Sequence, residues 1–134
     1  MSVQYSAAVR NAMVDAIEST ISTSPKLRFY TGAAPASCAD AASGTLLVEM
    51  SLPSDWMSAA SNGVKSQVGT WQANASAAGT AGHYRIVDTA GTTCHEQGTI
   101  TATGGGGDMT LDNTNIASSQ LVTITSKTIT AGGA

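Results

Sequence analysis

The most regular hydrophobic pattern lies at the start of the chain. Large apolar residues recur at every fourth position, and alanines widen the stripe they form. This spacing keeps side chains on one face of a helix, so it predicts a helix over Ser2–Thr23 with Ser2 as its N-cap. Pro25 ends it, because the residue before proline disfavours the α conformation. The stripe consists of Tyr5, Val9, Met13, Ile17 and Ile21.

Two roles are open for this helix. It can cover one face of a sheet with its apolar stripe, or it can reach across to a neighbouring subunit.

The remainder of the chain alternates apolar and polar residues with the period of two that is typical of strands. The clearest case is a hairpin over Ala81–Ile100, in which Tyr84 and Ile86 point to one face while His83, Arg85 and Val87 point to the other. Its turn is predicted at Asp88–Thr92, where Gly91 is free to adopt a positive φ. The other predicted strands are Lys26–Tyr30, Thr45–Leu52, Gly63–Gln72, Asp108–Asp112 and Gln120–Thr130.

Several connections interrupt this pattern. Ser54–Asn62 is either one helical turn or an irregular loop, and the four glycines of Gly104–Gly107 predict a hairpin loop. In the last strand, strict alternation would point Ile129 to the face opposite Val122 and Ile124. A bulge or break near Ser126 and Lys127 is therefore expected to return Ile129 to the core. The tail Ala131–Ala134 is expected to fray.

One helix followed by about seven short strands indicates a mostly β protein. We expect a single domain over residues 1–134, with an N-terminal helix in 1–24 and a β-sandwich or jelly-roll-like fold in 25–134. Charged residues make up 11% of the chain, against about 25% in an average soluble domain. Such a surface suits a protein that packs against copies or partners, although a neutral soluble domain is the simpler alternative.

Charge and hydropathy exclude several classes of partner. The net charge is −3 and the six Lys and Arg residues are scattered, which argues against nucleic-acid binding. No apolar run approaches the roughly 18 residues of a membrane helix. Asp15 and Glu18 interrupt what would be the apolar part of a signal peptide, so we expect synthesis in the cytoplasm.

No residue set predicts an active site. His83, Cys94, His95 and Glu96 are the only cluster of metal-ligand types, but Cys94 and His95 are adjacent and point to opposite faces of a strand. We therefore expect neither metal, cofactor nor enzymatic activity. Cys38 and Cys94 could pair, although two cysteines make no disulfide framework and buried thiols are favoured. Trp56 and Trp71 could stack on sugars, although anchoring the core is favoured.

Five segments carry a resemblance to a known group of proteins. They read, in order, MSVQYSAAVRNAMVDAI, KLRFYTGAAP, GTLLVEMSLP, AGTAGHYRIVDTAGTTCHEQGTI and DMTLDNTNIASSQLVTITSKTITAGG. Their order resembles that of small structural proteins of tailed-bacteriophage virions, some of which are capsid decoration, or cement, proteins.

This resemblance implies a virion component made in the host bacterial cytoplasm. A decoration protein would form a homo-oligomer, a dimer or trimer, and would bind the major capsid protein. The alternative is a tail or fibre component, such as a receptor- or sugar-binding module. The residues expected to make oligomer or shell contacts are Tyr5, Val9, Met13, Ile17, Trp56 and Trp71.

Overall fold

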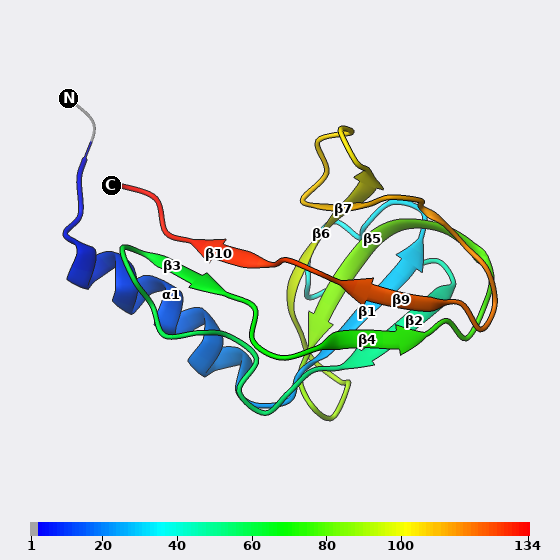
Figure 1. The fold of residues 1–134 in the computed structure, drawn as a ribbon, viewed down its shortest axis with the longest axis horizontal. Coiled ribbons are helices and arrows are strands. Elements are labelled where there is room, and N and C mark those ends of the chain that lie inside the picture. The colour runs from blue at the N-terminus through cyan, green and yellow to red at the C-terminus, as the bar shows by residue number, and fades with distance from the viewer. Residues whose placement is uncertain (1–2) are drawn as a thin grey trace.

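A computed structural model describes residues 3–134. The chain is mostly β with one N-terminal helix, as the sequence predicts. The helix α1 (Ala7–Ile21) comes first, and ten strands follow among the described residues (Figure 1). These are β1 (Lys26–Thr31), β2 (Leu46–Ser51), β3 (Val64–Ser66), β4 (Trp71–Asn74), β5 (Gly79–Val87), β6 (Cys94–Ala102), β7 (Met109–Leu111), β8 (Asn115–Ile116), β9 (Leu121–Ile124) and β10 (Thr128–Thr130).

The helix begins later than the apolar stripe suggests. Its N-cap is Ser6, whose hydroxyl accepts a hydrogen bond from the N–H of Val9 at 3.2 Å. The predicted start at Ser2 is therefore wrong, and Ser2 itself lies outside the described residues. The helix ends where Ser22 adopts a φ of 72° and its N–H still donates to Glu18 O.

The largest sheet has the strand order β2-β1-β5-β6-β7, and β8 adds to β5. The predicted hairpin forms its centre, as the antiparallel pair β5 and β6. Leu27 pairs with Ile86 and Phe29 with Tyr84 across β1 and β5, so these four side chains share the buried face. The predicted assignment of faces in the hairpin is confirmed.

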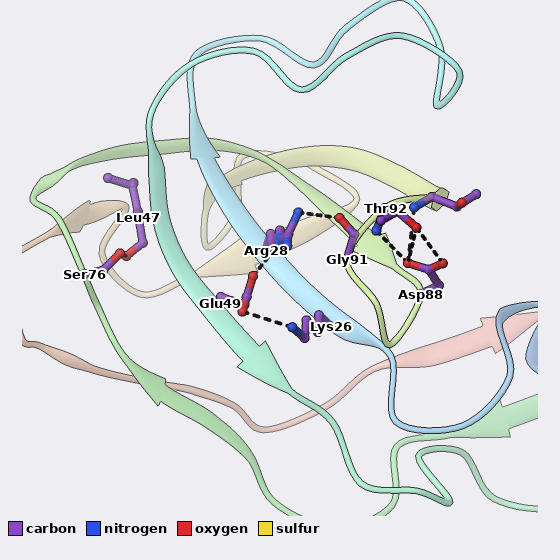
Figure 2. Close-up of polar contacts among 9 residues, drawn as sticks. Lys26, Arg28, Leu47, Glu49, Ser76, Asp88, Gly91 and Thr92 are labelled. Carbon is purple, nitrogen blue, oxygen red and sulfur yellow. Dashed lines mark hydrogen bonds and ion pairs between the residues drawn. The ribbon is translucent and has the colours of Figure 1, made fainter.

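A side chain holds the turn of this hairpin. Asp88 Oδ1 accepts hydrogen bonds from the N–H groups of Thr92 at 2.8 Å and Thr93 at 3.2 Å (Figure 2). These bonds from the backbone lower the pKa of Asp88. Gly91 has a φ of 77°, the conformation the turn was expected to need.

The glycine-rich segment does not form a hairpin, which corrects the prediction. β7 pairs with β6 in parallel, with Ile100 opposite Met109, so the chain must loop back before it pairs. Gly107 packs closely on Thr101: its N–H donates to Thr101 Oγ1 at 2.9 Å, and a Cβ there would lie 2.8 Å from that oxygen. The glycines therefore allow a compact loop rather than a tight reversal.

A two-stranded ribbon of β4 and β9 lies in front of the main sheet (Figure 1). Trp71, Val122 and Ile124 from this ribbon belong to the same buried cluster as Leu27 and Phe29. The segments predicted as single strands at 63–72 and 120–130 are each divided in two. The break in the second lies where it was expected, and Ile129 is buried as predicted.

The remaining sheet is the pair β3 and β10, which lies beside α1 and away from the main sheet (Figure 1). The C-terminal segment is held here rather than frayed. Ala131 N–H donates to Gly63 O at 2.8 Å, and Tyr5 N–H donates to Gly133 O at 2.7 Å. Both ends of the described chain therefore meet at the helix.

Within residues 3–134, no helix has the length and apolarity needed to cross a bilayer.

Candidate functional site

The helix α1 buries Val14 and Ile21 against the rest of the protein, and polar side chains beside them bind the neighbouring turn and strand. Asn11 Oδ1 accepts a hydrogen bond from Gly63 N–H at 2.7 Å, and Arg10 Nη1 donates to Asn62 O at 2.6 Å. Both partners lie in the turn just before β3. At the other end of the helix, Trp56 Nε1 donates to Ser22 O at 2.8 Å. These bonds hold the helix at both ends.

A buried lysine of β3 forms two ion pairs with α1. Lys65 of β3 is 4% exposed, and its Nζ lies 2.6 Å from Asp15 Oδ1 and 2.7 Å from Glu18 Oε2. Burial alone would lower the pKa of Lys65, but the hydrogen bonds and charges of Asp15 and Glu18 outweigh it and raise that pKa. The lysine therefore stays charged and bridges two successive turns of the helix.

As a consequence, the apolar stripe faces outward. The exposed fractions are 47% for Tyr5, 45% for Val9, 43% for Met13 and 38% for Ile17. Only Ile21 of the stripe is buried. The option that the stripe covers a face of the sheet is therefore wrong, because the face that packs on the protein carries the buried Val14 together with the polar residues Asn11 and Glu18.

The exposed face has a definite shape. Val9, Met13 and Ile17 lie four residues apart and form one ridge along the helix, and the exposed Tyr5 precedes the N-cap Ser6 at the start of this row. Ala8, Ala12, Ala16 and Thr20, also four residues apart, form a parallel row of small side chains beside it, and all four are exposed. We call these two rows the ridge and the groove; the ridge comprises Tyr5, Val9, Met13 and Ile17. Neither row contains a charged residue, and the only polar groups of the side chains are the hydroxyls of Tyr5 and Thr20.

The exposed apolar area of this face is larger than that of single hydrophobic residues scattered over a surface. The four ridge residues together with Val3, which is 71% exposed, leave an apolar area on the order of 400 Å² in water. That is comparable to the largest patch on a typical monomer, which is often functional. The exposed small side chains of the groove enlarge this face further.

The two tryptophans belong to the interior. Trp56 is 1% exposed and Trp71 is fully buried, and their ring centroids lie 6.1 Å apart. Trp71 Nε1 donates to Val68 O at 3.0 Å, so both indole N–H groups have partners. The core role is confirmed, and the expectation that they contact a partner is wrong in this conformation, as is a role in stacking on sugars.

The cysteines also differ from expectation. Cys38 and Cys94 form a disulfide, so the expectation of buried free thiols is wrong. The bond attaches the loop between β1 and β2 to the start of β6. Because its sulfur is bonded to Cys38, Cys94 is not a thiolate ligand for a metal. Within the described residues, no three metal-ligating side chains of His, Cys, Asp or Glu come together.

Comparisons of the chain with protein-family models, with curated proteins and with solved structures find no match. The sequence pattern identified the four ridge residues and the alanines that widen the stripe, but it did not indicate that this face lies in water rather than against the sheet.

Proposed function

We propose that this chain is a structural protein that works by association rather than catalysis, and that the ridge and groove of α1 pair with those of a second copy. The observation that carries the proposal is the orientation of the helix: Lys65 binds its two carboxylates on the side of the protein, while the large apolar side chains of Val9, Met13 and Ile17 lie in water. Exposing such a face costs free energy in proportion to its apolar area. Pairing removes that cost.

The shape of the face favours a second copy as the partner. Rows four residues apart on one helix pack between the equivalent rows of another, with axes crossing at about −50°. A two-fold axis would place the ridge of each copy in the alanine groove of the other. Small residues in the groove let the two helices approach closely, and the absence of charge on both faces avoids repulsion between identical surfaces.

We further propose that the assembly is a tailed-bacteriophage virion, in which the protein acts as a capsid decoration protein on the major capsid protein. Sequence resemblance and the low charged content of 11% support this role. Paired subunits that each bind the shell would tie neighbouring capsid subunits together, and many modest interfaces would add up through avidity. In this arrangement the β4–β9 ribbon over the main sheet would serve as the second layer of a β-sandwich-like domain.

Two measurements test the proposal. Sedimentation velocity compares the natural protein with Met13→Asp, which places a charge in the ridge, and with Ser118→Asp, which places the same charge on an exposed turn far from α1. We expect the natural protein and Ser118→Asp to form dimers and Met13→Asp to be a monomer with an unchanged circular dichroism spectrum. Dimers of equal affinity in all three would overturn the pairing.

The second measurement concerns the virion. Labelling purified particles with an antibody against the chain distinguishes heads from tails. Labelled heads that lose thermal stability when the protein is omitted support the decoration role. Label confined to the tail would replace it with the tail-component alternative, and particles without any label would overturn the virion role.

A further inference from the structure

The outer face of the main sheet carries more positive charge than its own carboxylates balance. Glu49, Arg28, Arg85 and Gln97 lie in one row across β2, β1, β5 and β6. Arg28 and Arg85 are directly opposite each other, an arrangement that is destabilising for like charges unless something compensates it. Lys26 lies on the same face, so three cations share the single carboxylate of Glu49.

The Glu49 carboxylate, at the β2 end of the row, already forms ion pairs with Arg28 and Lys26. Arg28 Nε donates to Glu49 Oε2 at 2.7 Å, and Lys26 Nζ lies 3.6 Å from Glu49 Oε1 (Figure 2). Arg28 Nη1 also donates to Gly91 O at 3.3 Å, which places the guanidinium over the hairpin turn. Glu49 therefore neutralises Arg28 and Lys26 in part and leaves Arg85 without a counter-charge.

Arg85 is the unusual member of the row. It is 3% exposed, yet no carboxylate of residues 3–134 forms an ion pair with it. Its Nη2 donates to Cys38 O at 2.8 Å and Asp40 O at 3.0 Å, while its Nε is buried with no acceptor among the described residues. Buried arginines are rarely left without an anionic partner, because desolvating the charge is costly.

Both arginines line one open cleft of about 660 Å³ between the β1–β2 loop and the hairpin turn. Gly91, Thr92 and Thr93 form one wall, and Cys38 to Ala42 form the other. The disulfide between Cys38 and Cys94 holds the two walls in place. Asp40 also lines the cleft, but its carboxylate accepts a hydrogen bond from Ser37 N–H at 3.0 Å and makes no ion pair with Arg85.

We propose that this cleft binds an oxyanion, a phosphate or a carboxylate group, which supplies the counter-charge that Arg85 lacks and that Arg28 shares with Lys26 on Glu49. Guanidinium groups match the geometry of both oxyanions and form strong charge-assisted hydrogen bonds with them. The proposal does not depend on helix pairing, since the cleft lies on the main sheet and α1 takes no part in it.

The test uses the full chain labelled with ¹⁵N. Sodium phosphate is titrated against sodium chloride at equal ionic strength while the amide signals of Ala41, Ala42 and Thr92 and the Arg85 Nε signal are followed. We expect saturable shifts with phosphate and none with chloride. Arg28→Gln and Arg85→Gln should each weaken binding about tenfold or more, whereas Arg10→Gln, which removes an arginine of α1, should not.

A third variant, Asp40→Asn, tests the cleft with Arg85 in place, so its result does not depend on whether Arg85→Gln folds. Asp40→Asn preserves the acceptor for Ser37 but removes the negative charge from the cleft, so it should tighten phosphate binding several-fold. Equal shifts with chloride and phosphate, or an affinity unchanged in all three cleft variants, would overturn the proposal.

Two more probes separate the sources of the anion. Sodium acetate and an acetylated tetraglutamate peptide are titrated at equal carboxylate concentration. Tighter binding of the peptide supports a carboxylate carried by a partner protein, and tighter binding of phosphate than of either supports a free anion. No saturable binding of any of the three overturns the site.

Discussion

Lys65 Nζ lies 2.6 Å from Asp15 Oδ1, and this ion pair decides which side of the N-terminal helix meets the protein. Lys65 is nearly inaccessible to water, whereas the Asp15 side chain remains 53% exposed. Together with Glu18, the lysine draws the charged side of the helix onto β3. The apolar ridge is left on the outside as a direct result.

Replacement of Lys65 tests this relationship. Lys65→Met retains the length of the side chain but leaves Asp15 and Glu18 without their partner, so we expect the free energy of unfolding to fall by about 1–3 kcal/mol. The value is at the lower end for buried pairs because Asp15 is partly solvated. Urea denaturation measures it, with Lys26→Met as the matched control, since that more exposed pair should contribute less than about 1 kcal/mol. Equal losses in both variants would contradict the central role of Lys65.

A larger side chain in the groove distinguishes specific helix pairing from non-specific hydrophobic association. Ala12→Leu adds apolar area to the exposed face, yet it fills the space into which the partner ridge is proposed to fit. We expect the dimer dissociation constant to rise about tenfold or more, in line with the cost of overpacking. Analytical ultracentrifugation measures it, with Ala7→Leu, which lies outside the groove, as control. Stronger association of Ala12→Leu would argue for unspecific hydrophobic contact instead.

Stability should decline in alkaline solution. Burial raises the pKa of Tyr84 above its ordinary value of 10.0, and the negative charge of Glu96, to which its hydroxyl donates at 2.7 Å, raises it further. Above pH 10 the unfolded chain then loses this proton while the folded chain keeps it, so the free energy of unfolding falls as pH rises. The raised pKa of Lys65 acts in the same direction above pH 10.5.

Urea denaturation at pH values between about 8 and about 11 measures this decline, because this interval includes the ordinary pKa of tyrosine. Tyr84→Phe cannot release a proton at this position, so its stability should fall less steeply over the same interval. A curve for Tyr84→Phe parallel to that of the natural protein would show that other groups cause the decline.

The disulfide is expected to contribute substantially to stability. It joins cysteines 56 residues apart, and closing a loop of that length restricts the unfolded chain. A reducing agent should therefore lower the free energy of unfolding by about 2–4 kcal/mol. The double variant Cys38→Ala, Cys94→Ala should start from the lower value and show no response to the reductant. A natural protein that is equally stable with and without reductant would contradict this expectation.

Much of the fold was predictable from local patterns. The period of two correctly placed Tyr84 and Ile86 on one face of the hairpin and Arg85 on the other, because alternation along a strand is a property of the backbone. The parity of Ile129 likewise indicated a break before the last strand. These features depend on neighbours in the sequence, and the pattern of apolar residues carries the necessary information.

Other features depended on partners distant in sequence. The stripe from Tyr5 to Ile21 predicted a helix, but periodicity does not say which side of a helix meets the protein. That was decided by Lys65, fifty residues beyond Asp15, because a buried lysine requires carboxylates and only the polar side of the helix supplies two. The parallel pairing of β7, the disulfide and the direct opposition of Arg28 and Arg85 are likewise set by tertiary contacts. The sequence by itself thus indicated the helix, most of the strands and the alternation of faces along them, whereas the tertiary structure decided which charges had to be satisfied and which apolar surface was left for a partner.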